Sequence, residues 1–149
     1  MKPIRTLVLI ADDQTARFLI NDGIGKGLKE VAGLSAAQFL DAQIDYDDRP
    51  GRQTGGPGGV ARHGFDPGEK ADEAGRSRFA GYVAEELGRE WTRIKPDRLI
   101  LAAAPKMLGA LRSRLNGAPA AALHGDLAKD LVKVAVRDLP GYFADIQPM

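Results

Sequence analysis

Two continuous apolar runs dominate the hydrophobic pattern of the chain. The first, TLVLIA, spans residues 6–11, and the second, DRLILAAA, spans residues 97–104. Apolar runs of this length, bounded by charged residues, are typical of strands that are buried on both faces in the middle of a sheet. We therefore predict two central strands, one near the beginning of the chain and one in its second half.

Two further strands are predicted directly after the first. The segment ARFLI at 16–20 follows an Asp-Asp-Gln turn and ends at Asn-Asp-Gly, which indicates a hairpin. Residues 28–32 alternate weakly between apolar and polar side chains, which favours a third antiparallel strand near the sheet edge. Between these two strands, the sequence GIGKG at 23–27 lacks the spacing of a phosphate-binding loop, so we predict a hairpin turn there.

Two helices are predicted from caps and apolar spacing. Asp66, Pro67 and Glu69 supply a helix cap, a proline at the first helical position and a capping-box partner. Apolar residues then recur at spacings of three and four, which predicts a stripe that packs on the sheet: Phe79, Tyr82, Val83, Leu87 and Trp91. A second helix is predicted from Pro105 to the Asn-Gly sequence at 116–117. Its apolar face consists of Met107, Leu108, Leu111 and Leu115.

The end of the chain completes the predicted fold. We expect a fifth strand at 120–123, parallel to the strand at 97–104 through a right-handed crossover, and a last helix at 136–144. The prediction is a single α/β domain over residues 1–149, with a mixed five-stranded sheet covered by helices. An antiparallel meander in this sheet is continued by parallel strands, an order that resembles the ribonuclease-H-like architecture.

Composition narrows the class of protein. The chain contains no cysteine, which excludes disulfides, zinc–thiolate sites, iron–sulfur clusters and a thiol nucleophile, and which suits a reducing compartment. A formal net charge of +1 gives no global attraction to nucleic acid or membrane. The first apolar run meets Asp12 too early for a signal peptide, and no apolar run approaches the ~20 residues that span a bilayer. We therefore expect a cytoplasmic protein that does not insert into membranes.

A long segment without helical or strand periodicity, at about 41–65, is the most informative part of the sequence. Between Pro50 and Gly64 it holds six glycines and two prolines, and from Arg49 to Gly64 it holds no acidic residue. Its candidate ligand-binding residues are Arg49, Arg52, Gly55, Gly56, Arg62 and His63. Glycines allow close approach of the backbone, and guanidinium groups grip phosphates bidentately, as an RNA-contacting loop requires. The alternative is a solvated loop whose arginines pair with the aspartates just before it.

Other chemically interesting residues have simpler interpretations. Asp12 and Asp13 follow the first predicted strand and Asp126 follows the fifth, so they could gather at one end of the sheet as in metal-dependent nucleases, although aspartate is also ordinary turn chemistry. We expect a structural role for His124 and a normal helix start at Pro105 with Lys106. The glycines at 55–59 lack dinucleotide-binding spacing, so no cofactor, metal ion or catalytic residue is predicted.

An ordered set of segments resembles the bacterial host-attachment protein family. The segments that carry the resemblance are Leu9 to Asp12, Thr15 to Phe18, Asp48 to Arg52, the glycine-rich stretch to His63, Asp97 to Leu101, Ala104 to Gly109 and Lys129 to Leu131. The resemblance implies a role in the attachment of bacteria to host cells. It also implies similarity to the middle domain of archaeal and eukaryotic peptide release factors, which carries a Gly-Gly-Gln loop for peptidyl-tRNA hydrolysis. Here Pro57 follows the glycine pair and Gln53 precedes it, so transfer of the hydrolytic activity is not expected.

Three functions follow from these observations. The first is a non-enzymatic binding protein that contacts ribosomal RNA or tRNA, on the ribosome, through the basic glycine-rich segment. The second is a hydrolase of an RNA or peptidyl-tRNA ester that depends on His63. The third is a factor that binds a protein partner and affects attachment to host cells indirectly.

Overall fold

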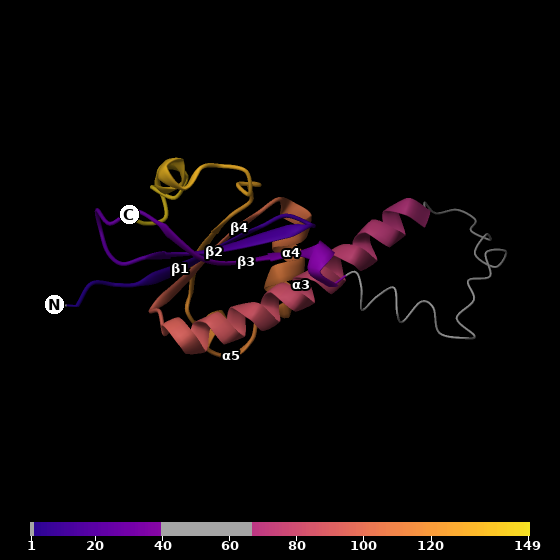
Figure 1. The fold of residues 1–149 in the computed structure, drawn as a ribbon, viewed down its shortest axis with the longest axis horizontal. Helices are drawn as coiled ribbons and strands as arrows, with labels where there is room; N and C mark the ends of the chain where they lie inside the picture. Colours follow the sequence, from indigo (N-terminus) through magenta and orange to yellow (C-terminus); the bar gives the residue numbers. More distant parts are fainter. Residues whose placement is uncertain (1, 40–66) are drawn as a thin grey trace.

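The computed structural model describes residues 2–39 and 67–149, and its centre is a five-stranded sheet in the order β3-β2-β1-β4-β5 (Figure 1). Its strands are β1 (Thr6–Ala11), β2 (Thr15–Asn21), β3 (Lys29–Ser35), β4 (Arg98–Ala103) and β5 (Leu123–Leu127). The helical elements are η1 (Ala36–Phe39), α3 (Pro67–Ile94), α4 (Pro105–Arg114), α5 (Gly117–Ala121), η2 (Val136–Asp138) and α6 (Leu139–Tyr142).

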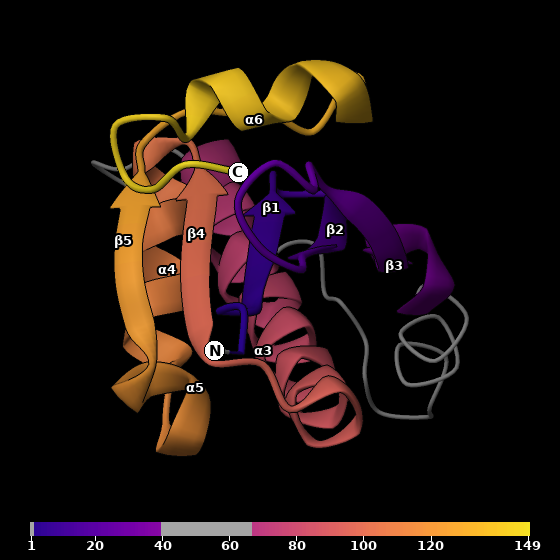
Figure 2. The same cartoon turned by 90° about the vertical axis from the view of Figure 1, so that its left-hand side faces the viewer.

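The sheet is mixed, as the sequence predicts. The strands β1, β2 and β3 form an antiparallel meander, while β1, β4 and β5 run parallel (Figure 2). Every residue of β1 is buried, because β1 is hydrogen-bonded on both sides and covered on both faces. The turn between β2 and β3 is built on the predicted glycines, since Gly23, Gly25 and Gly27 all have positive φ.

The two faces of the sheet pack against different parts of the chain. On one face, Leu7 and Leu9 of β1 lie in a core with Phe79, Val83 and other residues of α3 and α4. The predicted stripe on α3 is confirmed as core, because Phe79, Val83 and Leu87 are buried and Tyr82 and Trp91 are packed against them. The helix continues through its glycines and ends only at Ile94.

The other face of the sheet is covered by residues 128–149, which we call the C-terminal segment. Val8, Ile10 and Ile100 pack against its buried residues Leu131, Leu139 and Phe143. Arg17 of β2 holds the segment against the sheet. Its Nη1 donates hydrogen bonds to the backbone carbonyls of residues 131, 132 and 134 at 3.3, 3.0 and 2.8 Å. The segment therefore completes the fold with little regular secondary structure of its own.

Two predicted elements near the end of the chain were placed wrongly. The fifth strand was expected at 120–123, but Ala120 and Ala121 belong to α5 and the strand spans Leu123–Leu127. A single helix was expected at 136–144, but the chain forms a 3-10 turn at Val136–Asp138 and a short α-helix at Leu139–Tyr142. Three alanines and a proline favour the helical turn at 117–121, whereas the edge strand has polar residues that hide its pattern.

Candidate functional site

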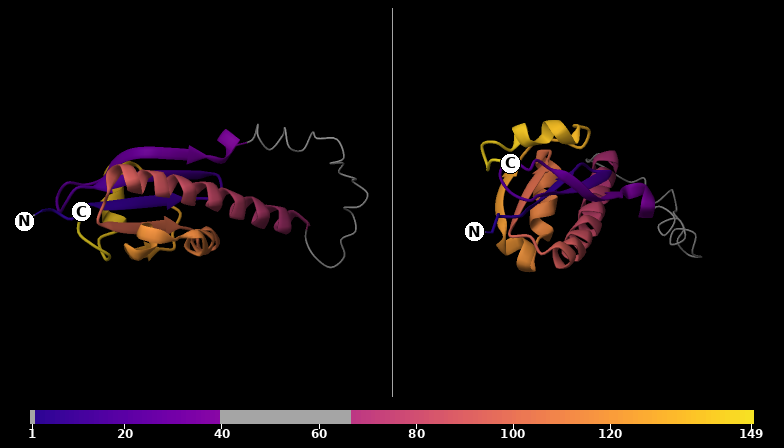
Figure 3. Two further views of the ribbon diagram at one scale, coloured as in Figure 1. Left: turned by 90° about the horizontal axis from the view of Figure 1, so that it is seen from below. Right: turned by 60° about the vertical axis from the view of Figure 1, so that its left-hand side comes forward.

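All six predicted ligand-binding residues lie outside the described part of the chain. They are Arg49, Arg52, Gly55, Gly56, Arg62 and His63. The described chain ends at Phe39 in η1 and resumes at Pro67, the first residue of α3. The beginning of α3 projects beyond the end of the sheet (Figure 1), and a second view shows the same projection (Figure 3).

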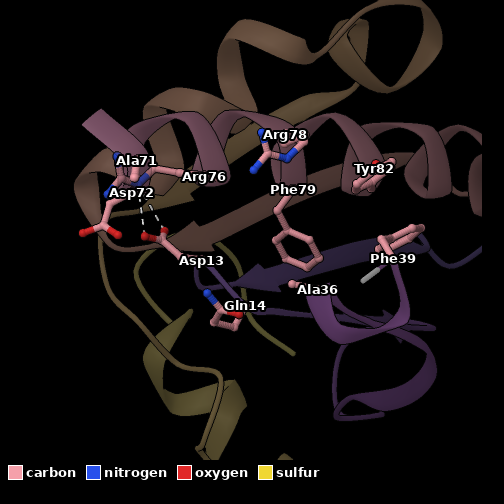
Figure 4. Close-up of a pocket in the computed structure, with 11 residues that line it drawn as sticks. Asp13, Gln14, Ala36, Phe39, Ala71, Asp72, Arg76, Arg78, Phe79 and Tyr82 are labelled. Carbon is pink, nitrogen blue, oxygen red and sulfur yellow. Dashed lines mark hydrogen bonds and ion pairs between the residues drawn. The ribbon is translucent and has the colours of Figure 1, made fainter. Parts of the chain in front are cut away.

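A pocket of about 260 Å³ lies beside the projecting part of α3. It is bounded by α3, by the turn between β1 and β2, and by η1 (Figure 4). The lining residues come from these three segments: Asp13, Gln14, Ala36, Phe39, Ala71, Asp72, Gly75, Arg76, Arg78, Phe79 and Tyr82.

Aromatic rings form the apolar side of the pocket. Phe39 of η1 stacks on Tyr82 of α3 with 3.9 Å between ring centroids and 5° between ring planes. Phe79 points from α3 toward Ala36 (Figure 4), and it is buried in the core beneath the pocket. This stack holds η1 against α3, so it fixes the point at which the chain leaves the described fold toward Arg49.

An ion pair forms the polar side of the pocket. The Nε of Arg76 on α3 lies 3.2 Å from both carboxylate oxygens of Asp13. The Arg76 side chain is 15% exposed and that of Asp13 is 41% exposed. Because the pair is partly open to water, its contribution to stability is small, and its main effect is to set the spacing between α3 and the turn.

The turn between β1 and β2 is held in shape because the Asp12 carboxylate accepts hydrogen bonds from the two residues Gln14 and Thr15 within it. One carboxylate oxygen of Asp12 accepts hydrogen bonds from the backbone N–H of Gln14 at 2.8 Å and of Thr15 at 2.6 Å, and from the Thr15 hydroxyl at 3.0 Å. The Gln14 carbonyl accepts a hydrogen bond from the Ala36 N–H at 2.7 Å. These contacts fix the floor of the pocket before any ligand is bound.

The three aspartates considered as nuclease ligands have separate partners. Asp12 caps its own turn, Asp13 pairs with Arg76, and Asp126 forms an ion pair of 3.1 Å with Arg112. Within residues 2–39 and 67–149, no group of three or more histidine, aspartate or glutamate side chains is arranged to hold a metal ion. The arrangement matches ordinary turn and surface chemistry.

The structure also places the two remaining candidates, His124 and Pro105. His124 lies on β5, one residue beyond the predicted strand, with its Nε2 3.4 Å from Nη1 of Arg98. The same Arg98 nitrogen donates to the Gln147 side chain at 3.1 Å, which ties β4 to the C-terminal segment. Pro105 begins α4 with no side-chain cap before it, which is a normal helix start.

Sequence reasoning missed the pocket itself. The pocket is lined by residues of three separate segments, such as Gln14, Phe39 and Arg76, and no local sequence motif indicates that these residues lie together. The available signal was an aromatic residue, Phe39, placed just before the long aperiodic segment. The Asp13–Arg76 pair has no counterpart in the sequence pattern.

The fold of the chain is shared with part of a translation protein of known structure. The chain is similar in structure to a crystal structure of an archaeal translation termination factor, with a TM-score of 0.53 and 14% sequence identity. The similarity covers 85% of this chain but only 31% of the termination factor, so it shows a shared fold with a part of that protein. The predicted release-factor-like fold is thus confirmed.

The family follows from a direct match. The model of the family described as "Protein required for attachment to host cells" matches residues 7–142, and the chain belongs to this family. No curated protein matches the chain. No helix in the described part of the chain is long and apolar enough to cross a membrane.

Proposed function

We propose that this host-attachment family member is a non-enzymatic binding protein that contacts RNA, on the ribosome in the cytoplasm. The contact residues are the candidates from the sequence: Arg49, Arg52, Gly55, Gly56, Arg62 and His63. The observation that carries the proposal is a group of three arginines with no acidic residue between Arg49 and Gly64. The described chain resumes after this segment at the start of α3, which projects from the sheet (Figure 1).

The position of the flanking residues supports this proposal. The segment leaves the fold at Phe39, which stacks on Tyr82, and returns at Pro67, fifteen residues earlier on α3 than Tyr82. At the α-helical rise of about 1.5 Å per residue, these two points are separated by roughly 22 Å along the helix. The described residues that flank the arginine-bearing segment therefore lie on η1 and at the start of α3, at the end of the molecule where α3 projects from the sheet.

The chemistry of the segment suits phosphate groups. Arg49 and Arg52 have planar guanidinium groups that bind two phosphate oxygens at once, and the glycines at 55 and 56 permit close approach of a backbone. Contacts of this kind position nucleic acid without reading its sequence. The fold shared with part of a translation termination factor agrees with a partner of this class, and it carries no further information on activity.

Affinity for RNA at several salt concentrations tests the proposal. The purified chain is titrated against a fluorescent single-stranded RNA, and the logarithm of the affinity is plotted against that of the salt concentration. Three phosphate contacts predict a slope of about −2, and the variant Arg49→Ala with Arg52→Ala should reduce its magnitude by about 1.4. The matched control is Lys133→Ala with Arg137→Ala, which removes the same charge from two exposed residues of the C-terminal segment.

Other outcomes would replace the proposal. If both double variants bind RNA equally well, the arginine-bearing segment is not the contact surface. Cleavage of a peptidyl-tRNA probe that is lost on His63→Ala would point to a hydrolase. If the wild-type chain binds no RNA but retains a protein partner after nuclease treatment, the chain acts through protein contacts instead.

A further inference from the structure

We propose that the groove between α3 and the junction of α4 with α5 binds the same groove of a second copy of this chain, which makes the protein a symmetric dimer. This inference is independent of the proposed RNA contact and uses only residues that the structure describes. The helices α3, α4 and α5 lie on one face of the sheet (Figure 2), and the groove runs where α3 meets the other two.

The groove has two adjoining parts. The first has a volume of about 630 Å³ and the second a volume of about 240 Å³. The two parts share four lining residues: Ala84, Gly88, Arg114 and Asn116. On α3 the groove extends from Arg78 to Thr92, which is about 21 Å at the rise of an α-helix. This length is sufficient for contact with another helix.

Small residues on α3 leave room for that contact. Gly81, Ala84 and Gly88 line the groove at spacings of three and four, so they lie on one side of the helix. An added Cβ at Gly88 would meet no atom within 4 Å, and the distance between two packed helices falls with the size of the side chains at their contact. Trp91 and Leu115, which are partly buried, add apolar surface that a second copy can cover.

Two opposite charges in the groove are left without a matching partner. Glu85 is exposed and makes no hydrogen bond or ion pair with the other described residues. Arg114 donates through Nη2 to the carbonyl of Ser77 at 3.1 Å and to its hydroxyl at 2.8 Å, so Nε and Nη1 have no acceptor in the described part of the chain. The guanidinium group lies over Gly81, because an added Cβ there would be 3.1 Å from Nη1.

A two-fold axis would match these two charges. If two α3 helices pack antiparallel, with the axis midway between residues 81 and 85, residue 81 of each helix lies opposite residue 85 of the other. Arg114, which lies over Gly81, then meets Glu85 of the second copy, and the contact occurs twice. A symmetric interface requires a surface that complements itself, and this groove carries both signs of charge. A partner with one sign of charge would leave either Glu85 or Arg114 unmatched.

Sedimentation velocity of the full chain at about 5–500 µM tests the proposal. We expect a Kd of about 10–100 µM, because the groove is small compared with the interfaces of stable dimers. Glu85→Arg and Arg114→Glu should each raise the Kd at least tenfold, because like charges would then face each other twice, at a cost of about tenfold or more. Asp145→Arg and Arg137→Glu make the same charge changes at exposed residues of the C-terminal segment, and both should dimerise as the wild type does.

A mixture of the two charge variants separates an interface from a folding defect. When Glu85→Arg and Arg114→Glu chains are mixed in equal amounts, opposite charges meet again at both contacts of a mixed dimer. The mixture should therefore dimerise with nearly the wild-type Kd, and native mass spectrometry should find one chain of each kind in the dimer. A defect in the fold of either variant would not be repaired by mixing. Failure of the mixture to dimerise would overturn the proposed contact.

The room above Gly88 gives a test that does not depend on charge. Gly88→Gln should weaken the dimer, because its side chain fills the groove. Gly109→Gln is the matched control, since Gly109 is an open and exposed glycine of α4 that does not line the groove. Equal dimerisation of the two glutamine variants would show that the interface lies elsewhere.

A distance measurement tests the direction of the two helices. The chain contains no cysteine, so Asp72→Cys, at an exposed residue of α3, takes a single spin label. Antiparallel packing about the proposed axis places the two labels roughly 30 Å apart, because each lies eleven residues from the axis at a rise of about 1.5 Å per residue. Parallel helices would place them about 10 Å apart, and that result would contradict the proposed symmetry.

Two further results decide between this inference and its alternatives. A wild-type chain that remains monomeric at about 500 µM overturns the dimer, since this concentration is well above the expected Kd. If that monomer retains a protein from lysate after nuclease treatment and Glu85→Arg loses it, the groove binds another protein. The variant Arg49→Ala with Arg52→Ala should dimerise as the wild type does. Dimerisation without any binding of RNA would overturn the proposed function and leave this inference standing.

Discussion

Lys95 stores backbone strain at the end of the longest helix. Among the described residues, it is the non-glycine residue with positive φ, at 54°. Its N–H donates to the Trp91 carbonyl at 2.8 Å, and Pro96 follows, so the left-handed conformation ends α3. A residue with a Cβ atom adopts this conformation at a cost of about 1–2 kcal/mol.

We therefore predict that Lys95→Gly stabilises the protein. Removal of the Cβ relieves the strain, while the greater freedom of glycine in the unfolded chain offsets part of the gain, which leaves about 0.5–1 kcal/mol. Urea unfolding measures the difference, and Lys95→Ala, which keeps the Cβ, should match the wild type within about 0.5 kcal/mol. A Lys95→Gly variant less stable than Lys95→Ala would show that the conformation is not strained.

Arg17 is the residue on which the attachment of the C-terminal segment most depends. Its side chain is 13% exposed, donates to three carbonyls of that segment and pairs with Glu30 at 2.9 Å. Arg17→Met would leave partly buried carbonyls without their donor, which should cost about 2–3 kcal/mol in the free energy of unfolding. Arg89→Met removes an exposed i,i+3 pair with Glu86 and should cost less than about 0.5 kcal/mol. Similar losses in both variants would contradict the special role of Arg17.

At the scale of elements, the C-terminal segment and β5 meet at a glycine. A Cβ at Gly125 would lie 2.8 Å from Cγ2 of Ile146, and this methyl group is attached to the branched Cβ, so it cannot swing away easily. Gly125→Ala should therefore displace the segment and cost about 1–3 kcal/mol.

Two further variants check this prediction by unfolding in urea. Ile146→Ala removes the clashing methyl, so the double variant should lose less stability than the sum of the two single variants. Gly33→Ala on the other edge strand is the matched control, because its added Cβ would lie 3.4 Å from the Ala16 carbonyl oxygen. Additive losses at positions 125 and 146 would mean that the two residues do not interact.

The elements that the sequence predicted well share a physical reason. The strand at 6–11 is buried on both faces, and the start of the long helix at Pro67 carries a proline, so local signals and final structure agree. The strand Leu123–Leu127 was misplaced because an edge strand need not be apolar. The last helix was predicted too long because the tertiary packing of Leu139 and Phe143 requires only short turns.

Sequence analysis could predict only those candidate residues that lie close together along the chain. The arginines at 49, 52 and 62 were recognised because they stand together without acidic neighbours, and their role stays a prediction. The pocket depends on the pairing of Asp13 with Arg76 and of Phe39 with Tyr82, which are contacts between distant parts of the chain. Only the fold brings such residues together, so no spacing in the sequence indicates them.

At the scale of the whole molecule, the covered faces of the sheet and the pocket lie in different parts of the fold. The sheet is covered on one face by α3 and α4 and on the other by the C-terminal segment, while the pocket and the projecting end of α3 lie together at one end (Figure 1). A formal net charge of +1 provides little general attraction to RNA. The proposed binding must therefore come from the local arginines, and this makes it sensitive to their removal and to salt.

The most direct test of this account is sedimentation of the tagged chain through a sucrose gradient of cell lysate, at low and at high salt. Phosphate contacts predict co-migration with ribosomes at low salt and release at high salt. The Arg49→Ala, Arg52→Ala variant should stay at the top of the gradient in both, while the Lys133→Ala, Arg137→Ala control should migrate as the wild type does. Migration of the wild-type chain only as a small free protein at low salt would contradict the account.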